Sequence, residues 1–266
     1  MTSREASLQV GRGGEPEPST VLIVIYNAIY WPYLFTSVAV LFVPAVALFL
    51  LTFWWDEKRR VLHRYTCWWG GHYLAWAPFA GVTVEGRERA MLAGPCVYVA
   101  NHQSMVDILA VFATRLEFLW VSKIENFYAP FLGWNMVLNR YVALKRGYLP
   151  SIMRMVRTCH RRLNEGHCLF VFPEGTRSPN GELIPFYSGA FRIAARNKVP
   201  IVPIVIEGTA RVLRKGRFRI VPHRCHVSIL EPLHPADVGF DHRRLHDLVR
   251  RRMQEEQARL RGRGPA

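Results

Sequence analysis

Residues 97–107 read Val-Tyr-Val-Ala-Asn-His-Gln-Ser-Met-Val-Asp, an apolar run that leads directly into a polar turn and then into another apolar stretch. Apolar runs this short are typical of strands buried in a sheet, and others follow it along the chain. The expected strands are Val97–Ala100, Leu169–Phe172 and Ile201–Ile206, and the expected helices lie near 104–115, 150–165 and 188–197. Strands alternating with helices predict an α/β fold, which we expect to be a mixed sheet flanked by helices.

The turn after the first strand contains His102 and Asp107, five residues apart. On one continuous helix, five steps of about 100° would point the two side chains away from each other. They can meet if His102 lies in the turn before the helix, with Ser104 as the N-cap and Asp107 at the third helical position, as in a capping box. The sequence therefore predicts a strand, a turn that holds the histidine, and a helix that carries the aspartate.

A histidine held by a carboxylate is the arrangement of general base catalysis. Asp107 would bind one imidazole nitrogen, and the other nitrogen would face a substrate hydroxyl. A structural interpretation stands beside this one, in which Asp107 only caps the helix and His102 is a hydrogen-bonded turn residue. On spacing alone, the structural interpretation is the more common one.

A second polar block, Phe172-Pro173-Glu174-Gly175-Thr176-Arg177-Ser178, also follows a predicted buried strand. Gly175 permits a tight turn that could present backbone N–H groups, Thr176 and Ser178 offer hydroxyls, and Arg177 offers a planar cationic fork for phosphate. Glu174 is a poor phosphate ligand, so we expect it to orient Arg177 or a substrate hydroxyl. The alternative is a polar turn with a solvated arginine. The basic pair Lys145-Arg146 is a weaker signal of the same kind.

Composition narrows the class of protein. Half of the 266 residues are hydrophobic and the formal net charge is +15, which suits anionic lipid surfaces, phosphate-bearing substrates or nucleic acid. The five cysteines, Cys67, Cys96, Cys159, Cys168 and Cys225, are scattered without a CxxC pair. Their number and spacing argue against a disulfide framework and a zinc site, so no metal is expected.

The stretch from Val21 to Trp55 contains no charged residue, and its second part alone is long enough to cross a bilayer. Aromatic residues at both ends are typical of membrane interfaces. Basic residues follow at Lys58-Arg59-Arg60, so the positive-inside rule places the rest of the chain on the cytoplasmic side. A single span and a hairpin bent at Pro32 or Pro44 both remain open.

We therefore expect a disordered lead over residues 1–20, a membrane-associated helical segment over 21–80, a catalytic domain over 81–240, and a basic C-terminal helix and tail over 241–266. In the last of these, apolar residues recur at helical spacing. That helix can dock on the domain or lie on anionic lipid, and docking is the more ordinary outcome.

Over roughly residues 80–230 the chain resembles the 1-acylglycerol-3-phosphate O-acyltransferase family of glycerolipid acyltransferases. The resemblance rests on NHxxxxD at 101–107, an arginine-bearing block that ends at Arg146, FPEGTRS at 172–178 and the apolar block at 199–203, in that order. It implies that His102 is the general base and Asp107 its partner. It also implies that Arg146, Glu174, Gly175, Thr176 and Arg177 bind the acceptor's phosphate.

The resemblance further implies direct attack of the hydroxyl of lysophosphatidate on an acyl thioester, from acyl-CoA or acyl carrier protein, with no cofactor and no covalent acyl-enzyme. Two departures concern the acceptor. Many family members carry lysine in a Pro-Phe-Lys-x-Gly run where this chain has Tyr187, and often an acidic residue where it has Lys145.

Several alternatives remain open at this point. The chain could act on another lyso-lipid, act as a CoA-independent transacylase, or use Cys96 as an acyl carrier, although no motif supports the last. Two further interpretations, in which the protein is not an enzyme, are a membrane scaffold and a nucleic-acid-binding protein. The uncharged run and the lack of a nucleic-acid-binding motif argue against the latter, so we expect membrane lipids and the acyl donor as partners, and no nucleic acid.

Overall fold

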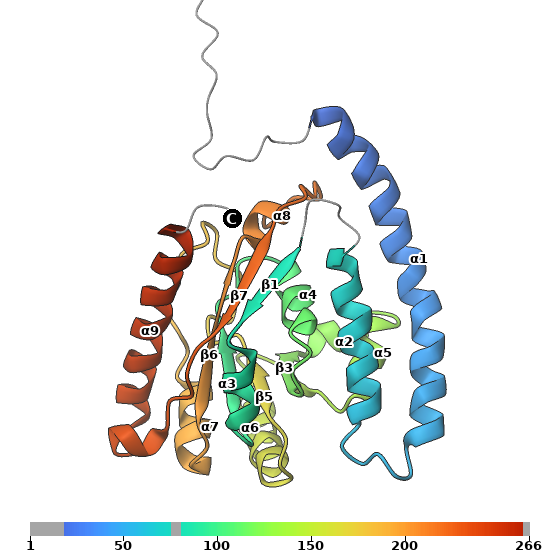
Figure 1. The fold of residues 1–266 in the computed structure, drawn as a ribbon. Helices are drawn as coiled ribbons and strands as arrows, with labels where there is room; N and C mark the ends of the chain where they lie inside the picture. The colour runs from blue at the N-terminus through green and yellow to red at the C-terminus, as the bar shows by residue number, and fades with distance from the viewer. Residues whose placement is uncertain (1–18, 76–80, 263–266) are drawn as a thin grey trace, which may run out of the picture.

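The computed structural model describes residues 19–75 and 81–262, so the predicted lead lies almost wholly outside the described residues, as do residues 76–80 and the end of the tail. Within the described residues, seven strands form one sheet (Figure 1). They are β1 (Val82–Glu85), β2 (Val97–Ala100), β3 (Leu119–Lys123), β4 (Val142–Leu144), β5 (Leu169–Val171), β6 (Ile201–Glu207) and β7 (Cys225–Ile229). The expected strands are thus present.

The strand order is β1-β7-β6-β2-β5-β3-β4. Strands β6, β2, β5, β3 and β4 run parallel, β7 pairs antiparallel to β6, and β1 runs parallel to β7. The sheet is therefore mixed, as predicted. Strand β2 is buried along its whole length because sheet neighbours flank it on both sides and helices cover both faces.

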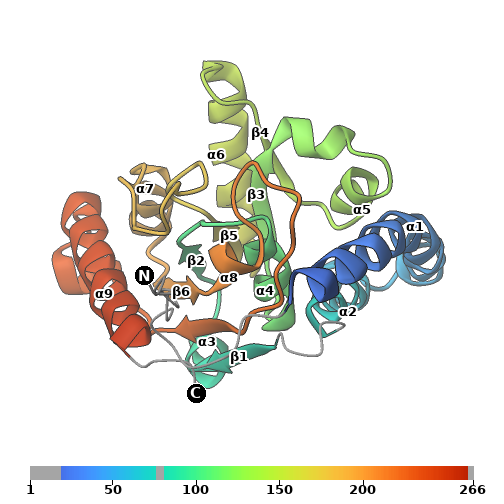
Figure 2. The same ribbon diagram turned by 90° about the horizontal axis from the view of Figure 1, so that it is seen from above.

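Helices lie on both faces of the sheet (Figures 1 and 2). They are α3 (Arg87–Leu92), α4 (Val106–Ala113), α5 (Leu132–Leu138), α6 (Leu149–Asn164), α7 (Gly189–Asn197), α8 (Thr209–Val212) and α9 (His242–Gly262), with 3₁₀ turns at Ile124–Tyr128 and Pro235–Val238. Helix α4 lies on one face, and α7 and α9 lie on the other.

Two further helices, α1 (Thr20–Thr52) and α2 (Arg60–Ala75), form an antiparallel pair beside α4 (Figure 1). Asp56 fixes the turn between them, since its carboxylate accepts hydrogen bonds from the N–H groups of Arg60 (3.0 Å) and Val61 (2.8 Å) at the start of α2. Helix α2 packs between α1 and α4, and its Trp69 and Tyr73 are buried there. The pair is therefore joined to the sheet domain through α2.

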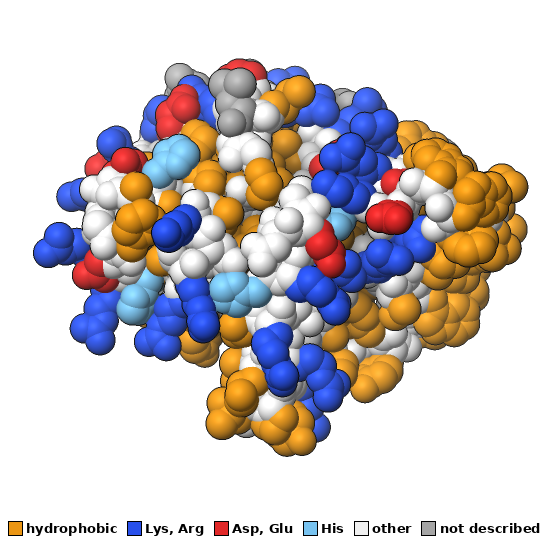
Figure 3. All heavy atoms as spheres, turned by 90° about the horizontal axis from the view of Figure 1, so that it is seen from below, with side chains coloured by type: hydrophobic (Ala, Val, Ile, Leu, Met, Phe, Trp, Pro, Cys, Tyr) orange, Lys and Arg blue, Asp and Glu red, His pale blue; other side chains and the backbone are white. Residues whose placement is uncertain are grey.

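Helix α1 is one continuous helix of 33 residues that passes through Pro32 and Pro44 without a break, which decides against a hairpin bent at either proline. At 1.5 Å per residue it is about 50 Å long, more than the roughly 30 Å hydrocarbon core of a bilayer. By length and composition it could cross a membrane, and only 11% of its most apolar window is buried. Hydrophobic side chains gather along the side of the molecule that α1 occupies (Figure 3).

The basic helix α9 docks on the sheet rather than standing apart. Leu245, Val249 and Met253 are fully buried on its inner face, and the helix packs against β6 and α7. Gln257 adds a buried hydrogen bond to the carbonyl of Gly181 at 2.9 Å. The ordinary outcome expected for this segment is the one observed.

Candidate active site

The two polar blocks lie side by side at the carboxyl end of the sheet. Strands β2 and β5 are parallel neighbours, and the blocks follow directly after them. From β2 the chain crosses to β3 through α4, and from β5 it crosses the opposite way to β6 through α7. Because such crossovers are right-handed, their opposite directions place these helices on opposite faces of the sheet. Open α/β sheets bind ligands in the crevice at a switch point of this kind, so we infer the binding crevice to lie between the ends of these two strands.

His102 and Asp107 meet as the turn geometry predicts. The Nδ1 atom of His102 lies 2.8 Å from Oδ2 of Asp107. The aspartate side chain is completely buried, whereas 15% of the histidine side chain is exposed. Because Nδ1 faces the carboxylate, Nε2 is the imidazole atom left to contact a substrate.

Three further groups hold the carboxylate of Asp107. Its Oδ2 atom accepts the backbone N–H groups of Gln103 (2.6 Å) and Ser104 (2.8 Å), and its Oδ1 atom accepts the hydroxyl of Thr209 in a short hydrogen bond. A buried carboxylate needs such partners, since an unpaired one would lose hydration without compensation. Thr209, at the start of α8, is a site residue that the sequence analysis did not single out.

Helix α4 begins one residue later than predicted. Its first residue is Val106 and Met105 occupies the N-cap, so Asp107 lies at the second helical position. The hydroxyl of Ser104 still accepts a hydrogen bond, from Val106 N–H at 3.2 Å, and donates one to the carbonyl of Leu213 at 2.7 Å. The contacts of Asp107 to the preceding turn keep residues 102–104 outside the helix, and this displaces the helix start.

The turn is also tied to the neighbouring strand β6. The side-chain amide of Asn101 exchanges two hydrogen bonds of 2.8 Å with the backbone N–H and C=O of Ile206. Gln103 donates to the same carbonyl at 2.5 Å. Asn101 and Gln103 thereby continue the pairing of β2 with β6 past the end of the strand and fix the position of His102 between them.

The second block supports the histidine from the other side. The ring of Phe172 stacks on the imidazole of His102, with 4.2 Å between centroids and an interplanar angle of 13°. The N–H group of Ser178 donates to the carbonyl of His102 at 2.7 Å, while the Ser178 hydroxyl donates to Asn180. The expectation that Ser178 offers its hydroxyl to a ligand is therefore wrong, because that hydroxyl is engaged within its own loop.

Glu174 lies buried beside the histidine and does not pair with Arg177. Its Oε1 atom accepts the backbone N–H of His102 at 3.4 Å, and its buried Oε2 atom has no hydrogen-bond partner among the described residues. Burial raises the pKa of Glu174 to about 8. A buried carboxyl group with an open oxygen and a raised pKa is a common feature of functional sites.

Gly175 allows the tight turn, with a positive φ of 69°, but its N–H group is used to close that turn onto the carbonyl of Phe172 at 3.1 Å. This N–H is therefore not free for a ligand. A β-carbon at Gly175 would lie 2.7 Å from the ring of Tyr187 and 3.5 Å from the guanidinium carbon of Arg146. The structure thus brings Arg146, far away in sequence, onto the same loop.

Thr176 is exposed and Arg177 is half-buried in this loop. Among the described residues, neither the Arg177 nor the Arg146 guanidinium forms a hydrogen bond or an ion pair, so both can bind an anion. The backbone carbonyl of Arg177 accepts the ammonium of Lys215 at 2.9 Å. Lys215, from the loop after α8, is a third cation beside this loop, and the sequence did not point to it.

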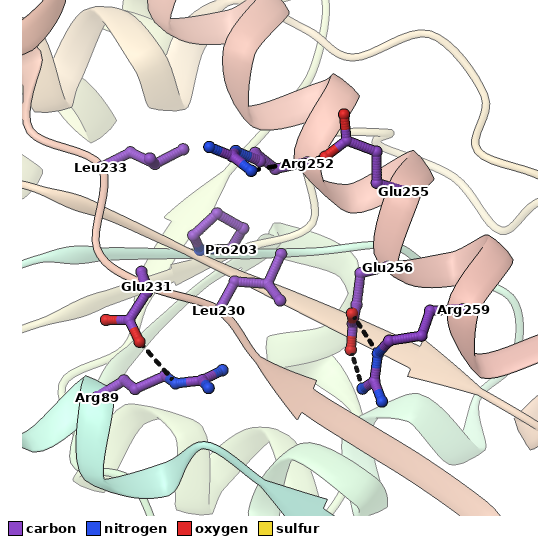
Figure 4. Close-up of a pocket in the computed structure, with 9 residues that line it drawn as sticks. All are labelled: Arg89, Pro203, Leu230, Glu231, Leu233, Arg252, Glu255, Glu256 and Arg259. Atoms are coloured by element: carbon purple, nitrogen blue, oxygen red, sulfur yellow. Dashed lines mark hydrogen bonds and ion pairs between the residues drawn. The ribbon is translucent and has the colours of Figure 1, made fainter.

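A separate hollow of about 380 Å³ lies between α9 and the loop after β7 (Figure 4). Its floor consists of Pro203, Leu230 and Leu233. The cations at its rim are paired with acidic neighbours, for example Arg89 with Glu231 at 2.8 Å. It contains no residue of either polar block, so it is distinct from the crevice at the strand ends.

The remaining candidates from the sequence do not join the site. Cys96 is completely buried directly before β2, at the opposite end of that strand from His102, so a thiol route through Cys96 is excluded by position. Across residues 19–75 and 81–262, no cluster of three or more His, Cys, Asp or Glu side chains could hold a metal ion.

Comparison with known proteins supports the resemblance seen in the sequence. The acyltransferase family model matches residues 81–207, which include both polar blocks. The 1-acyl-sn-glycerol-3-phosphate acyltransferase of Chlamydomonas reinhardtii is 35% identical over 79% of this chain and 65% of its own length. The chloroplastic enzyme of that name from Arabidopsis thaliana is 37% identical over 71% of this chain and 54% of its own length. The chain thus spans about half to two-thirds of these relatives.

A solved structure agrees over almost the whole chain. The crystal structure of the 1-acyl-sn-glycerophosphate acyltransferase PlsC from Thermotoga maritima superposes with a TM-score of 0.77 at 27% identity, covering 92% of this chain and 100% of that one. The two polar blocks, the fold and these relatives agree: residues 81–207 form an acyltransferase-family domain, and the chain is similar in sequence and structure to 1-acyl-sn-glycerol-3-phosphate acyltransferases.

Proposed function

We propose that this chain transfers a fatty acyl group from an acyl thioester to the free hydroxyl of 1-acylglycerol-3-phosphate, giving phosphatidate. The observation that carries the proposal is the buried His102–Asp107 pair, 2.8 Å apart, beside a loop with two unpaired arginines. A base on the same side of the sheet as a pair of unpaired arginines suits an acceptor that carries both a hydroxyl and a phosphate. The names of the relatives point to the same acceptor.

In this scheme Nε2 of His102 removes the proton of the acceptor hydroxyl as the oxygen attacks the thioester carbonyl. A carbon–oxygen bond forms and the carbon–sulfur bond breaks. The proton held by the imidazole then passes to the departing thiolate, so no cofactor is needed. Asp107 fixes the imidazole orientation and stabilises the positive charge that develops on it.

The acceptor's phosphate would bind between Arg146 and Arg177, with the exposed hydroxyl of Thr176 as a third donor. A guanidinium binds phosphate through two parallel hydrogen bonds, which also orients the rest of the molecule. Glu174, with its raised pKa, would be protonated near neutral pH and donate from Oε2 to an oxygen of the acceptor. This role replaces the direct phosphate contact that the family resemblance implies for Glu174.

We further propose that the outer face of α1 lies in a membrane while its inner face stays on the domain. Asn27 bonds to Ile220 near one end of the helix, the carbonyl of Leu41 accepts from Tyr65 in the middle, and Phe49 lies under Arg59 near the other end. The opposite side of α1 exposes large apolar residues, among them Val40, Val43 and Leu50. The basic residues after α1 support a cytoplasmic location for the catalytic domain.

Product analysis tests the proposed reaction. The full chain, purified in detergent, is given lysophosphatidate or lysophosphatidylcholine with either oleoyl-CoA or oleoyl-acyl carrier protein, and the diacyl products are measured by mass spectrometry. We expect phosphatidate with at least one donor and none without a thioester. Phosphatidate formed without a thioester would indicate a transacylase, and product only from lysophosphatidylcholine would overturn the proposed acceptor.

A variant pair tests the phosphate site. The Arg146→Ala and Arg177→Ala proteins are compared on lysophosphatidate and on monoacylglycerol, which lacks the phosphate. Losing a charged hydrogen bond costs roughly 1.5–3 kcal/mol, so kcat/KM for lysophosphatidate should fall about 10- to 100-fold. The rate with monoacylglycerol should stay the same. Equal losses on both acceptors would show that these arginines do not bind the phosphate.

A further inference from the structure

The loop between α8 and β7 has an unusual composition. From Leu213 to Arg224 the chain contains five lysine or arginine residues and neither aspartate nor glutamate. Every residue from Arg214 to Arg219 is exposed, whereas Val212 and Ile220 on either side are buried. We call residues 214–219, Arg-Lys-Gly-Arg-Phe-Arg, the basic tip.

The basic tip is held out from the domain by a defined base. Val221 N–H donates to the carbonyl of Val212 at 2.8 Å and closes the loop, and Arg217 N–H donates to the carbonyl of Arg214 at 3.1 Å within it. Asn27 of α1 clamps the base by accepting from Ile220 N–H and donating to its carbonyl, both at 2.8 Å. The exposure of the tip is therefore a consequence of ordered hydrogen bonds at its base.

Phe218 is 82% exposed at this tip. Its carbonyl accepts the indole N–H of Trp31 at 2.8 Å, and its ring meets the Trp31 ring edge-on with centroids 5.9 Å apart. Trp31 in turn stacks on Phe35, which is 68% exposed on α1. The rings of Phe218, Trp31 and Phe35 thus form a continuous row that joins the loop to the exposed apolar surface of α1. Figure 2 shows the loop beside the first turns of that helix.

The arginines of the basic tip have no neutralising partner among the described residues. No described acidic residue forms an ion pair with Arg214, Arg217 or Arg219. An exposed aromatic ring surrounded by unpaired arginines, continuous with an apolar helix face, is complementary to a bilayer leaflet with anionic headgroups, where the ring enters the hydrocarbon boundary and the cations meet phosphate.

The same loop reaches the active site. Lys215 donates to the carbonyl of Arg177, and the carbonyl of Leu213 accepts from the hydroxyl of Ser104, which lies in the turn of His102. The loop therefore connects α1 on one side with both catalytic loops on the other. A leaflet that contacts the basic tip would have its headgroup layer beside the crevice into which a lyso-lipid must enter.

We propose that the basic tip is a second membrane contact, specific for anionic leaflets, that sets the active site at the headgroup layer. An acidic protein such as acyl carrier protein also matches the charge of the tip. We favour the bilayer because the Phe218 ring is continuous with the exposed apolar surface of α1. A soluble protein bound at the tip would leave that apolar surface in contact with water. The inference rests on the proposed attachment of α1 to a membrane, so its test includes a probe on α1 itself.

The test uses single-cysteine probes in the full chain, reconstituted into vesicles. In a Cys168→Ser background the other native thiols are buried. Phe218→Cys reports on the tip, Val43→Cys on the outer face of α1, and Gln254→Cys on α9, on the other side of the molecule (Figure 2). Each carries an environment-sensitive dye, and quenching by spin-labelled lipid is measured in phosphatidylcholine with and without phosphatidylglycerol.

We expect spin-labelled lipid to quench the probes at 218 and 43 and to leave the probe at 254 unquenched. Phosphatidylglycerol should increase quenching at 218 at least twofold, and Arg214→Gln with Arg217→Gln and Arg219→Gln should abolish that increase. If the probe at 43 is quenched and the probe at 218 is not, the membrane contact of the tip is wrong while the attachment of α1 stands. If neither probe is quenched, the attachment of α1 is wrong as well. A response at 218 to acyl carrier protein in place of lipid would assign the tip to protein docking.

Discussion

At the scale of single residues, the position of the base depends on Asp107, whose carboxylate collects four hydrogen bonds. Replacing it by asparagine keeps the shape but presents an amide N–H₂ or a neutral oxygen to Nδ1 of His102. We expect Asp107→Asn to lower kcat by about 10²–10⁴-fold with a small change in KM, because this pair acts in the transition state. Steady-state kinetics of phosphatidate formation measure this.

Thr209 gives a finer test of the same carboxylate. Thr209→Val removes the hydroxyl bond to Oδ1 of Asp107 without changing the side chain's shape, and we expect kcat to fall about tenfold. Thr209→Ser keeps the hydroxyl and is the matched control, with activity near that of the unchanged protein. Equal activity of the valine and serine variants would show that Thr209 does not support Asp107.

Glu174 predicts a pH dependence of stability. Its pKa is raised from an ordinary 4.5 to about 8 by burial, so the folded chain keeps a proton that the unfolded chain has lost between those values. The free energy of unfolding should therefore decrease as the pH rises from about 5 to 8, by at most about 1.4 kcal/mol per unit of pKa difference. Glu174→Gln should flatten this dependence, as measured by denaturant unfolding at several pH values. A slope unchanged in the variant would assign it to other groups.

At the scale of elements, the contact between α2 and α4 joins the α1–α2 pair to the sheet domain. A β-carbon on Gly70 of α2 would lie 2.4 Å from the ring of Phe112 on α4, so Gly70→Ala must push the helices apart. We expect a loss of about 1–3 kcal/mol in the free energy of unfolding. Gly189→Ala at the start of α7, where a β-carbon meets nothing within 4 Å, should leave stability the same or raise it. Equal effects of the two substitutions would contradict this packing.

The elements were the part most readily predicted from the sequence. Apolar runs at 97–100 and 201–206 have few alternatives to buried strands, and the five-residue spacing of His102 and Asp107 is compatible with contact only across a turn. The exact start of α4 was missed by one residue. Its position depends on hydrogen bonds from the turn to Asp107, and helix-forming tendency does not encode them.

Long-range partners could not be predicted in this way. Thr209 is 102 positions away from Asp107 in the sequence and yet donates a hydrogen bond to it. Arg146 precedes Gly175 in the chain and Tyr187 follows it, and both lie beside that glycine. No local pattern marks these residues, because what selects them is the strand order. Tyr187 occupies the lysine position of the Pro-Phe-Lys-x-Gly run, and its ring lies against Gly175.

At the scale of the whole molecule, the apolar outer face of α1 and the basic tip lie on one side, which we propose faces lipid. We expect the protein to remain in the membrane fraction after washes with 1 M salt, because hydrophobic burial of α1 is not screened, and to be released by detergent. Fractionation followed by immunoblotting measures this. Release by salt alone would show that charge, and not α1, holds the protein on the membrane.

We propose that His102 is the base of an acyl transfer from a thioester to a lyso-lipid hydroxyl. The decisive measurement is thiol release from oleoyl-CoA and from oleoyl-acyl carrier protein, each with and without lysophosphatidate. The His102→Ala protein is compared with His242→Ala, a control substitution at the start of α9, outside the crevice. We expect acceptor-dependent release with at least one donor, retained in His242→Ala and reduced at least 10²-fold in His102→Ala, with unchanged thermal unfolding. Substantial acceptor-dependent release by folded His102→Ala, or none from either donor by the unchanged protein, would contradict it.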